Sequence, residues 1–308
     1  MTSGDETSVV PGVIEVGGHA PGPVVAVLGG VHGDELEGVL AARVIIDRLR
    51  ALAPGRLRGT VRVAAPAHPA AWEAGTRTSP IDGLNLARVF PGSADGSPTE
   101  QVAAHLTERV IAGADLLIDL HSAGLGFDMP LMVGYHTGPD PVCVRSAEAA
   151  EVFGAPFRWE HPHSVPGRSL SAAAALGVPS IYVEGRGGGQ VRRRELDCYV
   201  DGVLRVLHLL GVVDDGPAPA LEPEVVRGDG NTDGGVEATV AGFFVTSAGV
   251  GEQVTAGQVL GEVVDERGQV LATVTSPRGG IVMLTRRHAA VTAGDTLAIV
   301  AEKVGGTR

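Results

Sequence analysis

Cysteine and lysine are scarce in this 308-residue sequence, and each scarcity excludes a class of protein. Only Cys143 and Cys198 are present, so neither a disulfide framework nor a thiolate metal site is expected, and a reduced, cytoplasmic compartment is the simplest prediction. Lys303 is the only lysine among 24 lysines and arginines, and the formal net charge is −12. Nucleic-acid binding without base specificity depends on clustered basic residues, so no nucleic-acid partner is expected.

Long apolar runs are also missing. No uninterrupted stretch approaches the roughly 18 apolar residues of a membrane-spanning helix, and the opening MTSGDETSVV has neither the basic flank nor the apolar core of a secretory signal. No membrane partner is therefore expected. A hydrophobic content of 44% with 19% charged residues is typical of an ordered globular protein. Because a single domain usually holds roughly 100 to 200 residues, two domains are expected.

Up to about Val213, short β-rich runs alternate with longer segments that carry apolar residues at helical spacing. This alternation predicts an α/β domain over residues 1–215, with a sheet flanked by helices. The predicted strands are residues 23–28, 59–66, 114–121, 130–135 and 179–185. The predicted helices are residues 35–52, 99–113, 141–154 and 195–211.

The remainder, residues 216–308, predicts a smaller all-β domain. A segment rich in Pro, Asp and Glu between Val213 and Gly230 is expected to be a linker. Beyond it, VTAGQVL at 254–260 returns as VTAGDTL at 291–297, which indicates two similar hairpin units. The pattern resembles the barrel-sandwich domains that carry lipoyl or biotinyl groups. A swinging-arm role is excluded because no lysine lies between Glu222 and Lys303.

The stretch LGGVHGDELEG places His32 and Glu35 where a predicted strand ends and a helix begins. At i, i+3 in a first helical turn, both side chains project to the same side and can supply a nitrogen and an oxygen ligand to zinc. A catalytic zinc takes three protein ligands, and His121, at the end of the strand LLIDLH, is the predicted third. Asp119 points to the same strand face and is expected to orient a ligand. Taken alone, H-x-x-E is more often a surface histidine beside a helix N-terminal acid.

Four motifs occur in one order along the chain: HGDE at 32–35, NLARVFPG at 85–92, DLHSAG at 119–124 and YVEG at 182–185. Together they resemble the succinylglutamate desuccinylase and aspartoacylase family of zinc hydrolases, which is related to the zinc carboxypeptidases. The resemblance implies a zinc carboxypeptidase-like mixed sheet flanked by helices. Within that family, the run AGTRTSPIDGLNLARVFPG most resembles the ectoine-utilisation branch, which deacetylates N-acetyl-2,4-diaminobutyrate. The resemblance covers nearly the whole chain, including the small C-terminal β domain.

The resemblance implies one zinc ion per subunit, bound by His32, Glu35 and His121. It also implies that Glu184 is the general base and that Arg77 stabilises the oxyanion. Such an arrangement is chemically coherent, because zinc lowers the pKa of water toward about 7 and a nearby carboxylate can take the proton.

Arg88 is the predicted anchor for the carboxylate of the substrate, since guanidinium binds a carboxylate in a bidentate manner. Family members usually read N-L-N-R where this chain has Asn85-Leu86-Ala87-Arg88, so an asparagine that helps to hold substrate is replaced by alanine. In an extended segment Asn85 would face the same side as Ala87 and would compensate in part, so Asn85 is the second predicted substrate-binding residue.

These residues predict a zinc-dependent amidohydrolase acting on a small N-acyl amino acid, similar to N-acetyl-diaminobutyrate or to the substrates of aspartoacylase and succinylglutamate desuccinylase. Two alternatives stay open: a zinc carboxypeptidase for short peptides, and a catalytically silent binding or sensor protein. Self-association into a homo-oligomer is an expectation by analogy with the family. His161 and His163 are interpreted as structural or solvent-facing residues of a proline-bounded loop, not as metal ligands.

Overall fold

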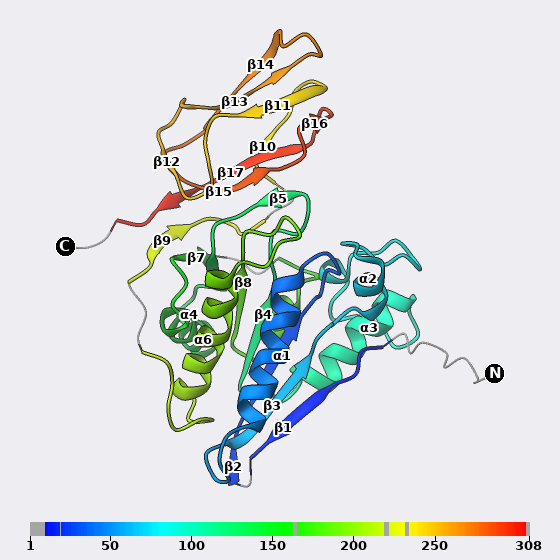
Figure 1. Cartoon of the computed structure of the whole chain (residues 1–308), viewed down its shortest axis with the longest axis vertical. Coiled ribbons are helices and arrows are strands. Elements are labelled where there is room, and N and C mark those ends of the chain that lie inside the picture. Colours follow the sequence, from blue (N-terminus) through cyan, green and yellow to red (C-terminus); the bar gives the residue numbers. More distant parts are fainter. Residues whose placement is uncertain (1–9, 19, 163–164, 219–221, 232–233, 306–308) are drawn as a thin grey trace.

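The computed structural model describes residues 10–18, 20–162, 165–218, 222–231 and 234–305. Within these residues it contains a large mixed sheet covered by helices and a C-terminal β domain (Figure 1). The helices are α1 (Leu36–Arg50), α2 (Pro69–Ala74), α3 (Pro98–Leu106, continued as a π-helical turn over Thr107–Ile111), α4 (Pro141–Phe153), α5 (Ser169–Ala175) and α6 (Arg193–Leu209). None of the described helices is both long enough and apolar enough to cross a bilayer.

The large sheet has the strand order β1-β3-β2-β4-β8-β6-β7-β9-β17-β15-β12. Strands β3, β2, β4 and β8 are parallel to one another, whereas β6, β7 and β9 run antiparallel to β8. The bounds in this part are β1 (Ile14–Gly17), β2 (Ala20–Gly29), β3 (Arg58–Ala64), β4 (Leu116–Leu120), β5 (Phe127–Asp128), β6 (Met132–His136), β7 (Phe157–His161), β8 (Ser180–Glu184) and β9 (Glu224–Arg227).

The central strands are apolar on both faces because helices cover both faces. Val25 and Val27 of β2 join the core formed with α1, α4 and α6, while Ala26 and Leu28 join the core formed with α3 and α5. Strands buried on two sides read as continuous apolar runs, which is why the five predicted strands are present as β2, β3, β4, β6 and β8. The four predicted helices are present as α1, α3, α4 and α6.

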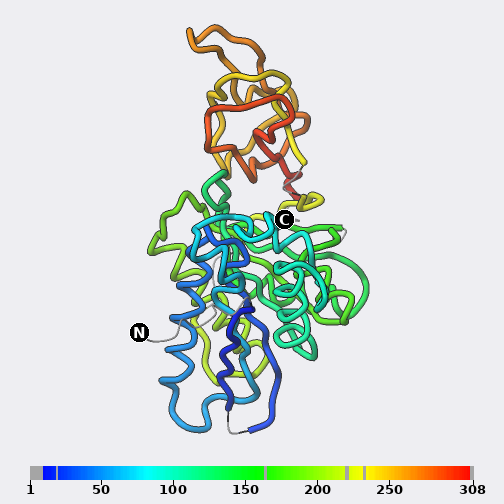
Figure 2. The backbone as a smooth tube through the Cα atoms, turned by 90° about the vertical axis from the view of Figure 1, so that its right-hand side faces the viewer, coloured from blue at the N-terminus to red at the C-terminus, as the bar shows by residue number. Residues whose placement is uncertain are grey.

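The C-terminal part is antiparallel throughout and lies beyond one end of the helical layers (Figure 2). It joins the large sheet directly, because β17 pairs with β9, and β15 pairs with β5. A separate sheet has the order β14-β13-β11-β16. The bounds are β10 (Val236–Glu237), β11 (Gly242–Thr246), β12 (Gln253–Val254), β13 (Val259–Val264), β14 (Val270–Thr275), β15 (Gly280–Arg286), β16 (Ala290–Val291) and β17 (Thr296–Lys303).

The repeated VTAG segments form the same turn twice. In the first copy, Gln258 accepts the backbone N–H of Thr255 through Oε1 at 3.0 Å; in the second, Asp295 accepts that of Thr292 through Oδ2 at 2.7 Å. The predicted pair of similar strand-turn-strand units is therefore present as β12–β13 and β16–β17.

The segment expected to be a linker does not remain outside the sheet. Residues 224–227 of this segment form β9, which pairs in parallel with β7 and continues the sheet toward β17. The prediction of an unstructured connection through Gly230 was therefore wrong for these residues. Val226 is fully buried, and this single inward-facing side chain gives too short an apolar signal to stand out among Pro, Asp and Glu. The domain boundary at residue 215 stays a prediction.

Candidate metal centre

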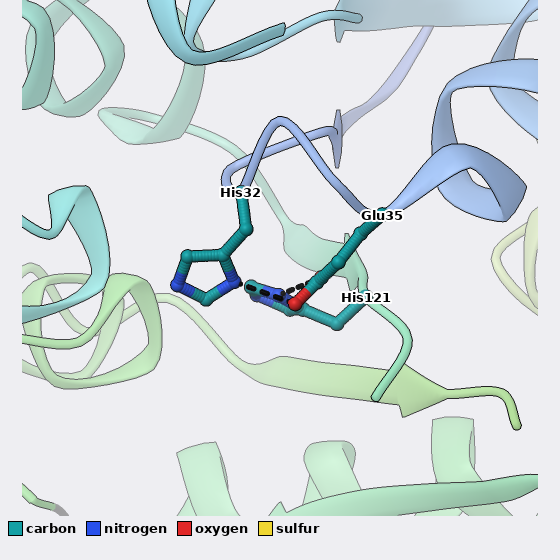
Figure 3. A group of neighbouring side chains, drawn as sticks. All are labelled: His32, Glu35 and His121. Carbon is teal, nitrogen blue, oxygen red and sulfur yellow. Dashed lines mark hydrogen bonds and ion pairs between the residues drawn. The ribbon is translucent and has the colours of Figure 1, made fainter. Parts of the chain in front are cut away.

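Three side chains from two distant parts of the sequence meet where β2 and β4 end. His32 lies in the turn after β2, Glu35 is the residue before α1, and His121 follows β4. One ligand atom from each lies within 4.8 Å of the other two, and all three residues are buried (Figure 3). The convergence of His32 and Glu35 comes from the turn itself, in which Glu35 N–H donates to His32 O at 3.3 Å, and not from a first helical turn as predicted.

Close packing of α1 against β4 brings Glu35 to His121. A Cβ atom on Gly38 would lie 2.2 Å from the carbonyl oxygen of Leu120, so only glycine permits this approach. Glu35 Oε2 then lies 2.9 Å from His121 Nδ1 and accepts the backbone N–H of Ser122 at 3.0 Å. The helix and the strand end are thereby joined at the carboxylate.

His32 presents a lone pair to Glu35. Burial lowers the pKa of His32, with Arg77 and His121 acting in the same direction against Glu35, so the ring is neutral at neutral pH. Asn85 Oδ1 accepts Ala87 N–H at 2.9 Å, which fixes the amide, and it accepts His32 Nε2–H at 3.0 Å. Nδ1 of His32 therefore carries no hydrogen although it lies only 2.7 Å from Glu35 Oε1. Because Nδ1 of His32 and Oε1 of Glu35 both present lone pairs, their arrangement suits a cation bound between them and not a hydrogen bond.

His121 lies between two carboxylates. Its Nδ1 faces Glu35, and its Nε2 lies 3.1 Å from Asp119 Oδ2. Burial opposes a charge on this ring, but Asp119 and Glu35 outweigh that effect and raise the pKa of His121 well above its usual range. Asp119 also accepts the hydroxyl of Ser169, and Tyr199 donates to His121 O. The donor set of two nitrogens and one carboxylate suits zinc, with His121 oriented from behind by Asp119, as the sequence predicted.

Replacing Asp119 with asparagine is expected to weaken zinc binding by about 10- to 100-fold, because an amide orients the imidazole without strengthening its basicity. Competition with a coloured chelator measures the zinc affinity. The exposed Asp215, which pairs with Arg56 on another surface, provides the control variant Asp215→Asn, which should bind zinc as the unaltered protein does. An unchanged affinity in Asp119→Asn would show that the carboxylate does not support the metal.

Glu184, at the end of β8, forms no ion pair with any residue that the structure describes. Its Oε2 atom is buried and has no hydrogen-bond partner among the described residues. Burial, reinforced by Glu35, raises the pKa of Glu184 to about 8, although His121 and Arg77 act in the opposite direction. Such an orphaned, perturbed carboxyl in a cavity is typical of a residue kept for chemistry and not for stability.

The raised pKa of Glu184 predicts a pH-dependent stability cost in metal-free protein. Between about pH 4.5 and pH 8 the carboxyl is protonated when folded and ionised when unfolded, so stability is lost as pH rises through this window. Glutamine stays neutral at every pH. We expect the melting temperature of Glu184→Gln, relative to the unaltered protein in chelator, to gain about 2 °C or more from pH 5 to pH 8.5. Thermal unfolding measures this, and an equal difference at both pH values would contradict it.

A cavity of about 90 Å³ adjoins these groups and contains three arginines. Arg77 Nη1 lies 3.0 Å from Glu35 Oε1 and 3.4 Å from His32 Nδ1. Arg88 and Arg168 both donate through Nη1 to the carbonyl oxygen of Ala87, at 3.0 and 3.1 Å. Two guanidinium groups thus converge on one backbone oxygen at the cavity wall, which gives an anionic ligand two adjacent cations.

Asn85 occupies a different place from the one expected. Leu86–Arg88 is a 3₁₀ turn that Asn85 caps, so the argument from an extended segment was wrong. Its side-chain oxygen is engaged by His32 and Ala87, and Asn85 does not line the cavity, whereas Ala87 does. Contact between Asn85 and a substrate stays a prediction, while its hydrogen bond to His32 links it to the metal centre.

The sequence predicted that His161 lies in a proline-bounded loop, and this prediction was wrong. His161 ends β7 and is 2% exposed in the cavity wall, while His163 lies outside the described residues. The alternation of Phe157, Trp159 and His161 was the available signal for a strand. The C-terminal part also contributes residues that the sequence did not single out: Leu284, Arg286 and Thr296 line a second cavity together with Arg77 and Glu184.

Comparison with known proteins gives a consistent result. The family model described as the succinylglutamate desuccinylase/aspartoacylase catalytic domain matches residues 21–210. The N-alpha-acetyl-L-2,4-diaminobutyric acid deacetylase of Halomonas elongata is 33% identical over 288 residues, which are 92% of this chain and 83% of that protein. A succinylglutamate desuccinylase/aspartoacylase from Rhodobacter sphaeroides has a TM-score of 0.84 and 30% identity, covering 95% of this chain and 89% of its own. The product-bound ectoine utilization protein EutE (DoeB) from Ruegeria pomeroyi has a TM-score of 0.86 and 27% identity, covering 94% and 88%.

Proposed function

Because the chain belongs to the succinylglutamate desuccinylase/aspartoacylase family, we propose that it is a zinc-dependent deacylase that hydrolyses the amide bond of a small N-acyl amino acid. The observation that carries the proposal is the buried meeting of His32, Glu35 and His121 beside the orphaned carboxyl of Glu184. These three residues would hold one zinc ion per chain. When bound, zinc supplies a Lewis acid that lowers the pKa of water and polarises the amide carbonyl.

Glu184 is the proposed general base. Its Oε2 atom makes no hydrogen bond within the described part of the chain. A cation held by His32, Glu35 and His121 would lower the pKa of Glu184 and favour the carboxylate, which could then accept a proton from the attacking water. The oxygen of that water bonds to the carbonyl carbon, the carbon–nitrogen bond breaks, and Glu184 returns the proton to the leaving amine. The products are a carboxylate and a free amino acid, and no oxidant or reductant is needed.

Arginines are proposed to stabilise the negative charges of the substrate and of the transition state. Arg77 is 40% exposed and lies beside the proposed metal ligands, so its guanidinium can stabilise negative charge that develops on the carbonyl oxygen. Arg88, with Arg168 next to it, can hold the carboxylate of the amino acid and fix the amide over the metal centre. Asn85 supports this arrangement by binding the ring of His32.

A panel of N-acylated amino acids tests the proposal. Purified protein loaded with zinc should release acetate from N-acetyl-L-2,4-diaminobutyrate or succinate and acetate from acidic N-acyl amino acids, and the free amino acid should appear in equal amount. Peptides of four or more residues are the control substrates. Release of C-terminal residues from these peptides, without deacylation of any small amide, would favour the carboxypeptidase alternative and overturn the proposal.

A further inference from the structure

Apart from His32, His121 and their neighbours Arg77, Asp119 and Glu184, two sets of polar residues that line the first cavity differ chemically. The loops around residues 87–88 and 165–168 contribute arginines, whereas strands β6, β7 and β8 and the turn after β9 contribute His136, His161, Tyr182 and Asp229. Within the described residues, the second group contains no arginine or lysine. We name His161, Tyr182 and Asp229 the acceptor group.

The hydrogen bonds of His161 determine what Tyr182 offers to the cavity. Nδ1 of His161 lies 3.1 Å from the carbonyl oxygen of Gly228, which can only accept, so Nδ1 carries the hydrogen. Nε2 is then an acceptor, and the hydroxyl of Tyr182 donates to it at 2.8 Å. Because its hydrogen is used in this way, the oxygen of Tyr182 presents lone pairs and no donor to a ligand.

The imidazoles on this side carry no positive charge at neutral pH. Burial lowers the pKa of His161 to about 4, and burial also lowers the pKa of His136. The Tyr182 hydroxyl keeps its proton because burial raises its pKa well above the usual range. Acceptors and neutral rings therefore face this part of the cavity.

Asp229 is held in place by its neighbours in the turn. Gly228 N–H donates to Glu160 O at 3.1 Å, and a Cβ atom on Gly230 would lie 2.5 Å from two ring atoms of His161. The backbone on both sides of Asp229 is thus packed against β7. Its Oδ1 accepts Asn231 N–H at 3.0 Å, and the side chain stays exposed at the cavity. A carboxylate with spare acceptor capacity is held at the edge of the site.

We propose that the acceptor group binds the ammonium group of a basic amino-acid side chain, with Asp229 as the specificity-determining residue. The inference rests on the proposed function, and it defines the substrates as N-acyl diamino acids. The arginines take the carboxylate of such a substrate, and Asp229 with the oxygen of Tyr182 takes its second amine. An acidic side chain would meet a carboxylate and lone pairs at the same place and is disfavoured.

Binding of free amino acids tests the inference without requiring turnover. In zinc-loaded protein, isothermal titration should give L-2,4-diaminobutyrate about 10-fold tighter binding than L-2-aminobutyrate, which lacks only the amine. Asp229→Asn should remove this preference and leave binding of L-2-aminobutyrate within about twofold. Asp215→Asn, a change of the same kind on an exposed residue paired with Arg56, should keep the preference. Equal binding of both amino acids by the unaltered protein would overturn the inference.

Kinetics separates a failure of this inference from a failure of the proposed function. Asp229→Asn should raise KM for N-acetyl-L-2,4-diaminobutyrate by about 10-fold and leave kcat/KM for N-acetyl-L-2-aminobutyrate nearly unchanged. A similar loss for both substrates would mean that Asp229 is merely structural, and the inference would be wrong. If the unaltered protein hydrolyses neither substrate, the proposed function fails, and the binding experiment alone decides the role of Asp229.

Discussion

Substitution of Glu184 by glutamine is expected to reduce kcat for deacylation by about a thousandfold, with little change in zinc content. Glutamine keeps the shape of the side chain but cannot take a proton from water. The carboxyl accepts no hydrogen bond from the described residues through Oε2, so no structural contact of that atom is removed. Steady-state kinetics together with metal analysis measures both quantities.

The control for this substitution is Glu151→Gln, because Glu151 is 72% exposed on α4 and is not among the cavity-lining residues. It should leave kcat unchanged. If Glu184→Gln hydrolyses N-acyl amino acids as fast as the unaltered protein, Glu184 is not the base. If the unaltered protein also has no activity while the biological role survives the substitution, the silent-sensor alternative is favoured.

Removal of the metal is expected to abolish activity, to below about 0.1% of the zinc-loaded rate, and addition of one equivalent of zinc should restore it. His121→Ala should have the same effect without chelator, because a catalytic zinc site with two protein ligands no longer holds its ion firmly. Activity assays on dialysed protein and metal stoichiometry by mass spectrometry test this. His288, exposed in the C-terminal part, provides the matched variant His288→Ala, which should keep about one zinc per chain. Full activity after complete metal removal would refute the zinc proposal.

The strand ends near the metal centre were predictable because of how parallel strands are buried. Residues 23–28 are a continuous apolar run that is followed four residues later by His32, and residues 116–120 are apolar except for Asp119 and are followed at once by His121. The four ordered motifs then identified the family, and the run AGTRTSPIDGLNLARVFPG indicated the ectoine-utilisation branch, one member of which is structurally similar to this chain. The local sequence was sufficient to predict a functional residue where that residue follows a strong strand signal at once or within a few positions.

Other parts of the site depend on contacts that no local pattern encodes. Asn85 binds His32 across 53 positions, and His161 binds the Gly228 carbonyl across 67. Strand β9 has four residues and only one fully buried side chain, so its own composition does not favour a strand. It forms because its backbone pairs with β7 on one side and with β17 on the other. Tertiary pairing of this kind overrides weak local preference.

The main-chain hydrogen bonds that β9 and β5 make with the C-terminal strands also limit how substrates can enter. A lid that swings on a hinge requires a border crossed only by flexible chain, yet here two strand pairings cross it, β9 with β17 and β5 with β15. Rotation of the C-terminal part away from the large sheet would break the hydrogen bonds of both strand pairs at once. Arg77 and Arg286 line the second cavity from the two sides of this border, so rearrangement of their side chains can widen the entrance without breaking either strand pairing.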